Sequence, residues 1–530
     1  MTTAPAPADG PRLIADRLHF WIFLAGCTAV TVGVLLHLPM FIMARSMGYR
    51  LAGMPMDTGM IIGMVLIVAG YFLAGYGLLP PKAPAAHVEV VVSPPEEASL
   101  TLAHWGLMVA LVLALIIDVM KPATLGFVMP GMIKEYGVTK AVAAWFPFSA
   151  LLGTFLGSIG WGVLADVYGR RATILLSAVM FVGTAICGAM PSIWWNVAMC
   201  FLMGVAAGGL LPVAYALLAE TMPTRHRGWA LVLVGGLGAV GGYLAASGLS
   251  AVLQPLFSWR IMWFLNLPTG LILIFMSRLI PESAKFLLTS GHVRQAHAIL
   301  ERFGSVARPR TVADSAEHHA EVAAPPIGKK YLGKTLALTV AALSWSFINF
   351  GILLWLPNDL VAKGYDVATS STLLSASALI ALPTVFIVSA LYSRWSTKWS
   401  LAASIALTGG GLVWVLLLDH APAGTMSPVG PIALLIVGSN ALLAIVLPYT
   451  AEIYPLRVRG RATGWVAGCS KLGGLISQGL GILGLIPPLG LAALYILAPI
   501  LLSIGLIGWF GPETRGKDLR ELDISWREVT

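Results

Sequence analysis

Three ionisable residues lie inside long apolar runs of the sequence. Asp118 and Lys121 share one run, three residues apart, and Lys471 lies about ten residues into another. A charge at the centre of a bilayer costs about 2.5–3.5 kcal/mol on insertion scales, which makes each of them a functional candidate. A low dielectric favours a protonated carboxyl, whereas a nearby ammonium favours the carboxylate. We predict that Asp118 alternates between pairing with Lys121 and binding a proton, while Lys121 holds an anion; a permanent ion pair on one helix face is the alternative.

Lys471 and two uncharged residues extend this predicted interior site. Two lysines against one acid make the site net positive, which favours a solute that carries a carboxylate. Trp345 could stack on a planar ligand, and Asn349, four residues further on, could supply a directional hydrogen bond. Each has a plainer alternative, because lysine can reach lipid headgroups, tryptophan anchors helices at the interface and asparagine packs helices together. We predict Lys121, Lys471, Asn349 and Trp345 as the substrate-binding residues.

The elements that must position these residues are membrane-spanning helices. Of 530 residues, 58% are hydrophobic and 11% are charged, against about 25% charged in soluble domains. The apolar runs are about 20 residues long, which is the length that an α-helix needs to cross a bilayer. The net charge of +9 is spread over short loops and does not form one basic face, so it indicates topology and no nucleic-acid partner. The hydropathy pattern predicts an all-α polytopic membrane protein with fourteen spans.

An internal repeat divides the core spans into two halves. Residues 219–228 (AETMPTRHRG) recur as 451–460 (AEIYPLRVRG) at an offset of 232, with six of ten residues identical. Pro281-Glu282-Ser283 recurs as Pro512-Glu513-Thr514 at an offset of 231. Two homologous six-helix bundles explain both repeats.

The repeat and the hydropathy pattern together predict six segments. They are an additional N-terminal transmembrane hairpin (1–79), a proline-rich extended linker (80–103), a first six-helix bundle (104–280), a cytoplasmic loop (281–334), a second six-helix bundle (335–510) and a cytoplasmic tail (511–530).

The loop after the second core span, residues 162–171 (GVLADVYGRR), resembles the signature of the major facilitator superfamily. The repeated A-E-x-x-P-x-R-x-R-G segments and the two Pro-Glu-Ser/Thr segments resemble the branch of sugar porters and metabolite:proton symporters, over about 104–517. The resemblance implies the major facilitator fold and a conformational gating cluster at the cytoplasmic face. Solvated loop charges are the alternative. The implied cluster consists of Asp166, Gly169, Arg170, Arg171, Glu220, Arg227, Glu452, Arg459, Glu282 and Glu513.

The stretch around Asp118 resembles the D-G-x-D motif of aromatic-acid:proton symporters, with Lys121 in place of the second acid. The seventh core span, in which Asn349 lies, lacks the glutamines of sugar-binding relatives. The resemblance therefore implies proton-coupled symport of a small organic anion, a carboxylate or aromatic acid, by alternating access. Proton-driven drug or metabolite efflux, sugar symport and a non-transporting membrane sensor on the same fold are the alternatives.

Loop charges predict the orientation, because Lys and Arg concentrate on the cytoplasmic side. They place both termini in the cytoplasm; Arg45 and Arg50 oppose the rule, so the N-terminal hairpin is the least certain part of this topology. No Asn-x-Ser/Thr acceptor is present, which favours a bacterial cytoplasmic (inner) membrane.

The remaining expectations concern chemistry and partners. We find no nucleophile–base pair or phosphate loop, and we interpret the methionines and His37 of the hairpin as apolar filler, so no enzyme, cofactor or metal is expected. A proton gradient is the expected driving force. The expected partners are a small-molecule substrate and the lipid bilayer; we expect a monomer whose N-terminal hairpin could contact a partner protein.

Overall fold

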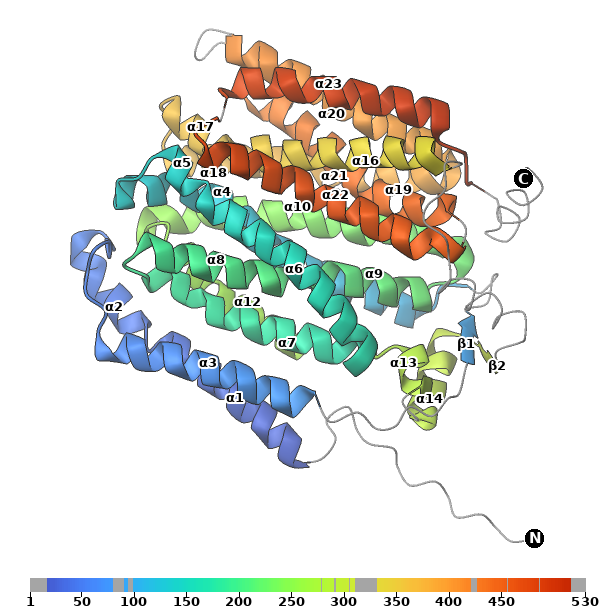
Figure 1. The fold of residues 1–530 in the computed structure, drawn as a ribbon, viewed down its shortest axis with the longest axis horizontal. Helices are drawn as coiled ribbons and strands as arrows, with labels where there is room; N and C mark the ends of the chain where they lie inside the picture. The colour runs from blue at the N-terminus through green and yellow to red at the C-terminus, as the bar shows by residue number, and fades with distance from the viewer. Residues whose placement is uncertain are drawn as a thin grey trace.

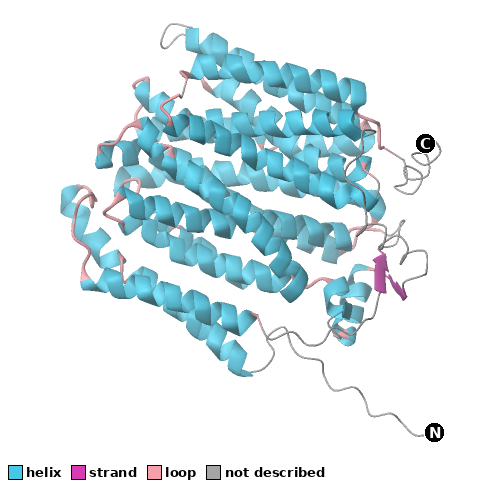
Figure 2. Ribbon diagram, viewed as in Figure 1, coloured by secondary structure: helices cyan, strands magenta, loops and turns pink. Residues whose placement is uncertain are grey.

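The structure is a computed structural model that describes most of the chain. The residues outside the description are 1–16, 80–89, 94–98, 278, 290–291, 305, 310–330, 421–426, 455, 486 and 516–530. The described residues form a bundle of roughly antiparallel helices, with a two-stranded sheet beside one end (Figures 1 and 2).

The N-terminal hairpin lies at one edge of the bundle (Figure 1). Its helices are α1 (Arg17–Leu35), α2 (Leu38–Met43), the 3-10 turn η1 (Ala44–Met47) and α3 (Thr58–Leu78). Glycines let α1 and α3 approach closely, since a Cβ on Gly33 would lie 2.6 Å from the carbonyl oxygen of Gly63. The hairpin packs against the first core bundle through Phe41, whose ring centroid lies 4.9 Å from that of Phe264.

The first core bundle contains six spans, several of them broken. They are α4 (Leu102–Tyr136); α5 (Lys140–Ala143) with α6 (Trp145–Tyr168); α7 (Arg170–Gly183) with η2 (Thr184–Ala189); α8 (Ile193–Ala207) with α9 (Leu210–Thr221); α10 (Thr224–Phe257); and α11 (Ile261–Phe264) with α12 (Asn266–Met276). The long α4 carries Pro122 and Pro130 and ends at Gly137, whose φ of +62° is a common helix stop.

The second core bundle repeats this plan. Its spans are α16 (Leu332–Ser346) with the π-helical turn η4 (Phe347–Leu353) and α17 (Leu356–Ala362); α18 (Val367–Ala381) with α19 (Thr384–Arg394); α20 (Thr397–His420); α21 (Val429–Ile453); α22 (Leu456–Ile482); and α23 (Leu489–Phe510). Twelve helical stretches of the described chain are long and apolar enough to cross a membrane. The shorter Ile261–Met276 and the 27-residue α22 account for the other two predicted spans.

A small element, which lies between the two bundles in the sequence, packs beside one end of the helices (Figure 1). It comprises α13 (Ala284–Thr289), α14 (Val293–Phe303) and the antiparallel pair β1 (Val90–Ser93) and β2 (Val306–Pro309). The segment predicted as an extended linker thus contributes a strand that pairs with the loop between the bundles. The rest of that linker, except its last residues, lies outside the described residues.

The two halves touch at both ends. We call the end with the α6–α7 junction at Gly169 the motif face and the end with Gly137 the opposite face. At the opposite face the hydroxyls of Ser250 and Ser371 lie 2.9 Å apart. At the motif face the Ser389 hydroxyl donates to the carbonyl of Trp229 at 2.9 Å. The two halves therefore contact each other near both ends of the bundle.

Candidate functional site

Asp118 and Lys121 lie in the middle of α4, and both are deeply buried, at 5% and 1% exposed. The structure, which describes both residues, shows no ion pair within 4.0 Å between the Asp118 carboxylate and the Lys121 ammonium. The Lys121 ammonium lies 2.9 Å from the ring centroid of Phe181 on α7, in the same half. Lys121 therefore makes a cation–π contact inside the first bundle, and Asp118 remains within electrostatic range of both Lys121 and Lys471.

Lys471 on α22 lies beside two aromatic rings of the seventh span. Its ammonium is 5.9 Å from the ring centroid of Trp345 and 6.0 Å from that of Phe350. The two rings meet edge to face, with centroids 5.8 Å apart. Trp345 is only 4% exposed, so it lies in the interior and does not serve as an interfacial anchor. Phe350 was not among the predicted residues, because nothing in an apolar run distinguishes one phenylalanine from another.

Several polar atoms of this interior lack a hydrogen-bond partner among the described residues. They are Asp118 Oδ1, Lys121 Nζ, Trp345 Nε1 and the hydroxyl of Tyr243 on α10. Most buried polar groups in proteins are hydrogen-bonded, so such groups call for an explanation. A polar ligand with both donor and acceptor atoms would supply one.

Asn349 lies in the π-helical turn η4, and it is half-buried. Such turns are rare and occur often at functional sites. The backbone carbonyl of Phe350, in the same turn, accepts a hydrogen bond from Gln478 Nε2 at 2.6 Å. The sequence signal for the break is weak and consists of Pro357 at the start of α17, which lacks the amide hydrogen that a continuous helix would need.

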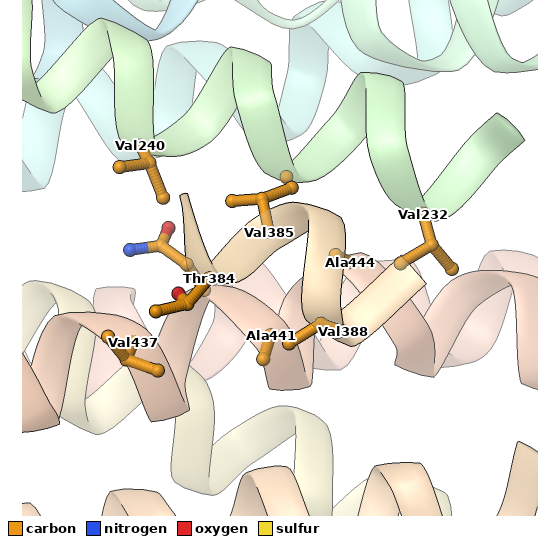
Figure 3. A pocket seen from close by; sticks show the side chains of 10 residues that line it. Val232, Val240, Thr384, Val385, Val388, Val437, Ala441 and Ala444 are labelled. Carbon is orange, nitrogen blue, oxygen red and sulfur yellow. The ribbon is translucent and has the colours of Figure 1, made fainter. Parts of the chain in front are cut away.

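A separate hollow lies between α10 of the first half and α19 and α21 of the second (Figure 3). Its lining is almost wholly aliphatic, with Thr384 and Asn440 as the polar members. The Asn440 amide donates to the carbonyl of Ile436, one turn earlier in its own helix, at 2.9 Å. None of the three interior charges lines this hollow, so it offers no counter-charge to an anion.

At the motif face, the repeated acidic residues cap helices. Glu282 accepts the backbone amides of Arg170 and Arg171 at 2.7 and 3.1 Å, at the start of α7. Glu220 pairs with the Arg170 guanidinium and accepts the Ser283 hydroxyl at 2.7 Å. Burial raises the pKa of Glu282, and the backbone hydrogen bonds oppose it. Gly169 is needed here, because its φ is +95° and a Cβ would lie 2.6 Å from the Glu282 carboxylate.

The second half repeats this arrangement with other residues. Glu513 accepts the backbone amide of Thr397 at 3.0 Å and the hydroxyls of Thr397 and Ser396, at the start of α20. Glu452 accepts the Thr514 hydroxyl at 2.6 Å, as Glu220 accepts that of Ser283. Burial works to raise the pKa of Glu513, but the hydrogen bonds from Ser396 and Thr397 outweigh it and lower the pKa to about 2.

The two acidic clusters meet across the halves. Glu452 and Glu220 are the acids that act electrostatically on Arg227 of α10. A Cβ on Gly228 would lie 3.2 Å from a carboxylate oxygen of Glu452, so the second half packs directly on the start of α10. The described members of the predicted gating set therefore lie together. The side chains of Asp166 and Arg459 lie outside the described part of the chain.

A buried charge cluster at the opposite face was missed by sequence reasoning. Glu135 of α4 pairs with Arg260 at 2.6 Å and accepts the Trp259 indole at 2.8 Å. The same carboxylate accepts the backbone amides of Leu51 and Ala52, in the hairpin loop, at 2.8 and 3.1 Å. Glu135 therefore docks the N-terminal hairpin onto the first bundle. Glu135 lies near the end of a span, where most charged side chains are solvated, so the sequence did not indicate that it contacts the hairpin.

Comparisons with known proteins agree with this architecture. Residues 107–478 match the profile of the Major Facilitator Superfamily. The chain is 25% identical over 444 residues to the niacin transporter NiaP of Acinetobacter baylyi, covering 79% of this chain and 97% of that one. It is 26% identical over 419 residues to the gallate transporter of Pseudomonas putida, covering 74% and 91%. The inward-open xylose transporter XylE from E. coli matches with a TM-score of 0.62 and 16% identity, over 80% of this chain and all of that one, which shows a shared fold.

Proposed function

Because this chain belongs to the major facilitator superfamily and is a multi-pass membrane transporter, we propose that it carries a small organic anion by proton-coupled symport. The observation that carries the proposal is the Lys471 ammonium beside the rings of Trp345 and Phe350. A cation beside two aromatic rings suits a flat molecule that bears a carboxylate. Two relatives are named for niacin and gallate, and each of these compounds is an aromatic ring with a carboxylic acid.

The proposed binding mode assigns a role to each predicted residue. The carboxylate pairs with Lys471, and the ring packs on Trp345 and Phe350. The unpartnered Trp345 indole nitrogen donates to a ring substituent, and Asn349 supplies a further hydrogen bond from η4. Lys121, held on Phe181, contributes positive potential from within the first half.

Proton coupling is assigned to Asp118. It is a buried carboxyl within electrostatic range of two lysines, one in each half. A carboxyl that is exposed first to one face and then to the other can bind a proton on one side and release it on the other. A substitution that keeps its shape and removes its titration should therefore uncouple transport from the proton gradient.

Alternating access is the proposed mode of movement. The hydrogen bonds between Ser250 and Ser371 and between Ser389 and Trp229 join the two halves at the opposite face and at the motif face. In this proposal, breaking the contacts at one face at a time opens that side. Parallel repeats of this kind rock around a site near the midplane. We assign the protein to a bacterial inner membrane, with the motif face and both termini in the cytoplasm, on the basis of the loop charges.

Reconstituted transport tests the proposal. Proteoliposomes with an inward proton gradient are given labelled nicotinate, gallate or xylose. We expect gradient-dependent uptake of at least one aromatic acid, little uptake of xylose, and loss of the gradient dependence in Asp118→Asn with binding retained. A protein that binds an aromatic acid but shows no flux under any gradient is not a transporter of that solute, and uptake that ignores the gradient in the parent protein excludes proton coupling.

A further inference from the structure

Two buried glutamines occupy equivalent places in the two halves. Gln254 on α10 is 7% exposed and Gln478 on α22 is 0% exposed. Gln254 Nε2 donates to the backbone carbonyl of Phe127 on α4 at 3.0 Å, and Gln478 Nε2 donates to that of Phe350 at 2.6 Å. The glutamines are 224 residues apart and the carbonyls 223 apart. In each half, one side-chain amide of the fifth span thus donates a hydrogen bond to a backbone carbonyl of the first. Without that bond the amide would have no partner, because the hydrocarbon core of a bilayer offers none.

The two glutamines differ in what they hold. Phe127 lies within the α-helix α4, whereas Phe350 lies in the π-helical turn η4. Gln478 also accepts the indole N–H of Trp355, two residues after the end of that turn, at 3.1 Å. Gln254 instead donates to Ser250 in its own helix at 2.6 Å. Gln478 therefore bonds both the π-helical turn and Trp355 shortly after it, whereas Gln254 bonds only α-helical residues.

The position of Phe350 depends on the π-helical turn. A π turn adds one residue to the helical repeat, so its loss would rotate the following residues by about 100° relative to those before it. The Phe350 ring lies beside Trp345 and Lys471, and Asn349 precedes it in the same turn. A shift of the turn would carry the Phe350 ring away from the ammonium and would turn Asn349 to another side of the helix.

We infer that Gln478 is a positioning residue of the candidate substrate site, which keeps η4 in its π-helical form so that the Phe350 ring stays beside Lys471. Gln254, its counterpart in the first half, supports α4 and the Ser250 contact at the opposite face, and its hydrogen bonds lie outside the candidate substrate site. The inference rests on the proposed function in so far as it takes Lys471 and the neighbouring rings as the substrate site.

The matched variants Gln478→Leu and Gln254→Leu test this. Each removes the two hydrogen bonds of one buried glutamine at an equivalent place, so both should lower the melting temperature by similar amounts. We expect only Gln478→Leu to weaken nicotinate or gallate binding, by tenfold or more in Kd measured by calorimetry. We also expect only Gln478→Leu to speed hydrogen exchange of the backbone amides of 347–354 by tenfold or more.

Equal changes of Kd in the two variants, or unchanged exchange of 347–354 in Gln478→Leu, overturn the inference. If the parent protein binds neither acid, the proposed function fails, and the exchange measurement alone still decides whether Gln478 holds the turn. If Gln478→Leu does not fold, Trp355→Phe removes one of the two bonds and keeps an aromatic side chain at that position. It should give a smaller change in the same two readouts, and no change in either refutes the inference.

Discussion

Replacing Lys471 by methionine should separate charge from packing in the candidate site. Methionine keeps the length and most of the volume of lysine but removes the ammonium. At 4 Å and an effective dielectric of about 20, the Coulomb energy of a carboxylate–ammonium pair is about 4 kcal/mol, part of which is lost to desolvation. Charged hydrogen bonds contribute about 1.5–3 kcal/mol net, so we expect nicotinate to bind Lys471→Met about 10- to 150-fold more weakly.

The assay compares two ligands of nearly the same shape, one with a carboxylate and one with an uncharged carboxamide. Nicotinamide has the ring of nicotinate and no carboxylate, so its affinity, measured by the same calorimetry, should change little in the variant. Lys363→Met is the control, because Lys363 pairs with Asp419 in an exposed position outside the interior. Equal losses for both ligands would mean that Lys471 acts through packing. No loss for either would remove Lys471 from the site and the organic-anion proposal with it.

Three further predictions concern the structure around the site. Glu513 has a pKa near 2, below that of an unfolded glutamate, so its contribution to stability is present above about pH 4.5 and is lost as the pH falls toward 2; Glu513→Gln should flatten the acid side of a melting-temperature profile. Gly169→Ala places a methyl group against Glu282 at a positive φ and should cost about 1–3 kcal/mol of stability, whereas Gly162→Ala, where a Cβ meets nothing within 4 Å, should be neutral in the same thermal assay. Glu135→Gln leaves a buried guanidinium without its counter-charge and should cost about 3–5 kcal/mol, with faster proteolysis of the hairpin loop at 44–57; a loop as resistant as in the parent would show that other contacts dock the hairpin.

Much of the fold was predictable because it depends on local information. Hydropathy over about 20 residues identifies a span wherever it packs, so the helical membrane fold was correctly predicted. The repeated acidic segments could be recognised in the sequence. Capping a helix and accepting a hydroxyl both require a carboxylate, and each half keeps one at the equivalent position. Lys471 and Trp345 were predicted separately, and the structure brings them together.

The rest depends on contacts between distant segments. The π-helical turn η4 is held by Gln478, more than 120 residues further along the chain, and no local pattern encodes that bond. Lys121 was predicted to pair with Asp118 from helical spacing, but its ammonium lies on the ring of Phe181, which depends on how α7 is rotated. Glu135 contacts the hairpin loop 83 residues earlier, at Ala52.

The two halves share contacts at positions where their sequences no longer match. Other residues have no counterpart in the other half, and these differences bear on function. The start of α20 shares no motif with that of α7, yet a glutamate caps both helices. The donors are backbone amides, which any residue except proline can supply, so the capped segments need not share a sequence.

The interior charges show the opposite behaviour. With the offset of 223 that relates Phe127 to Phe350, Asp118 corresponds to Ala341 and Lys121 to Ser344. With the offset of 224 that relates the two glutamines, Lys471 corresponds to Ser247. Residues that serve the relative movement of two similar bundles can occur in both halves. A single substrate bound between the halves contacts a different surface on each side, so each charged residue that binds it is needed in one half only. The residues that break the repeat are therefore the ones to which binding and coupling are assigned.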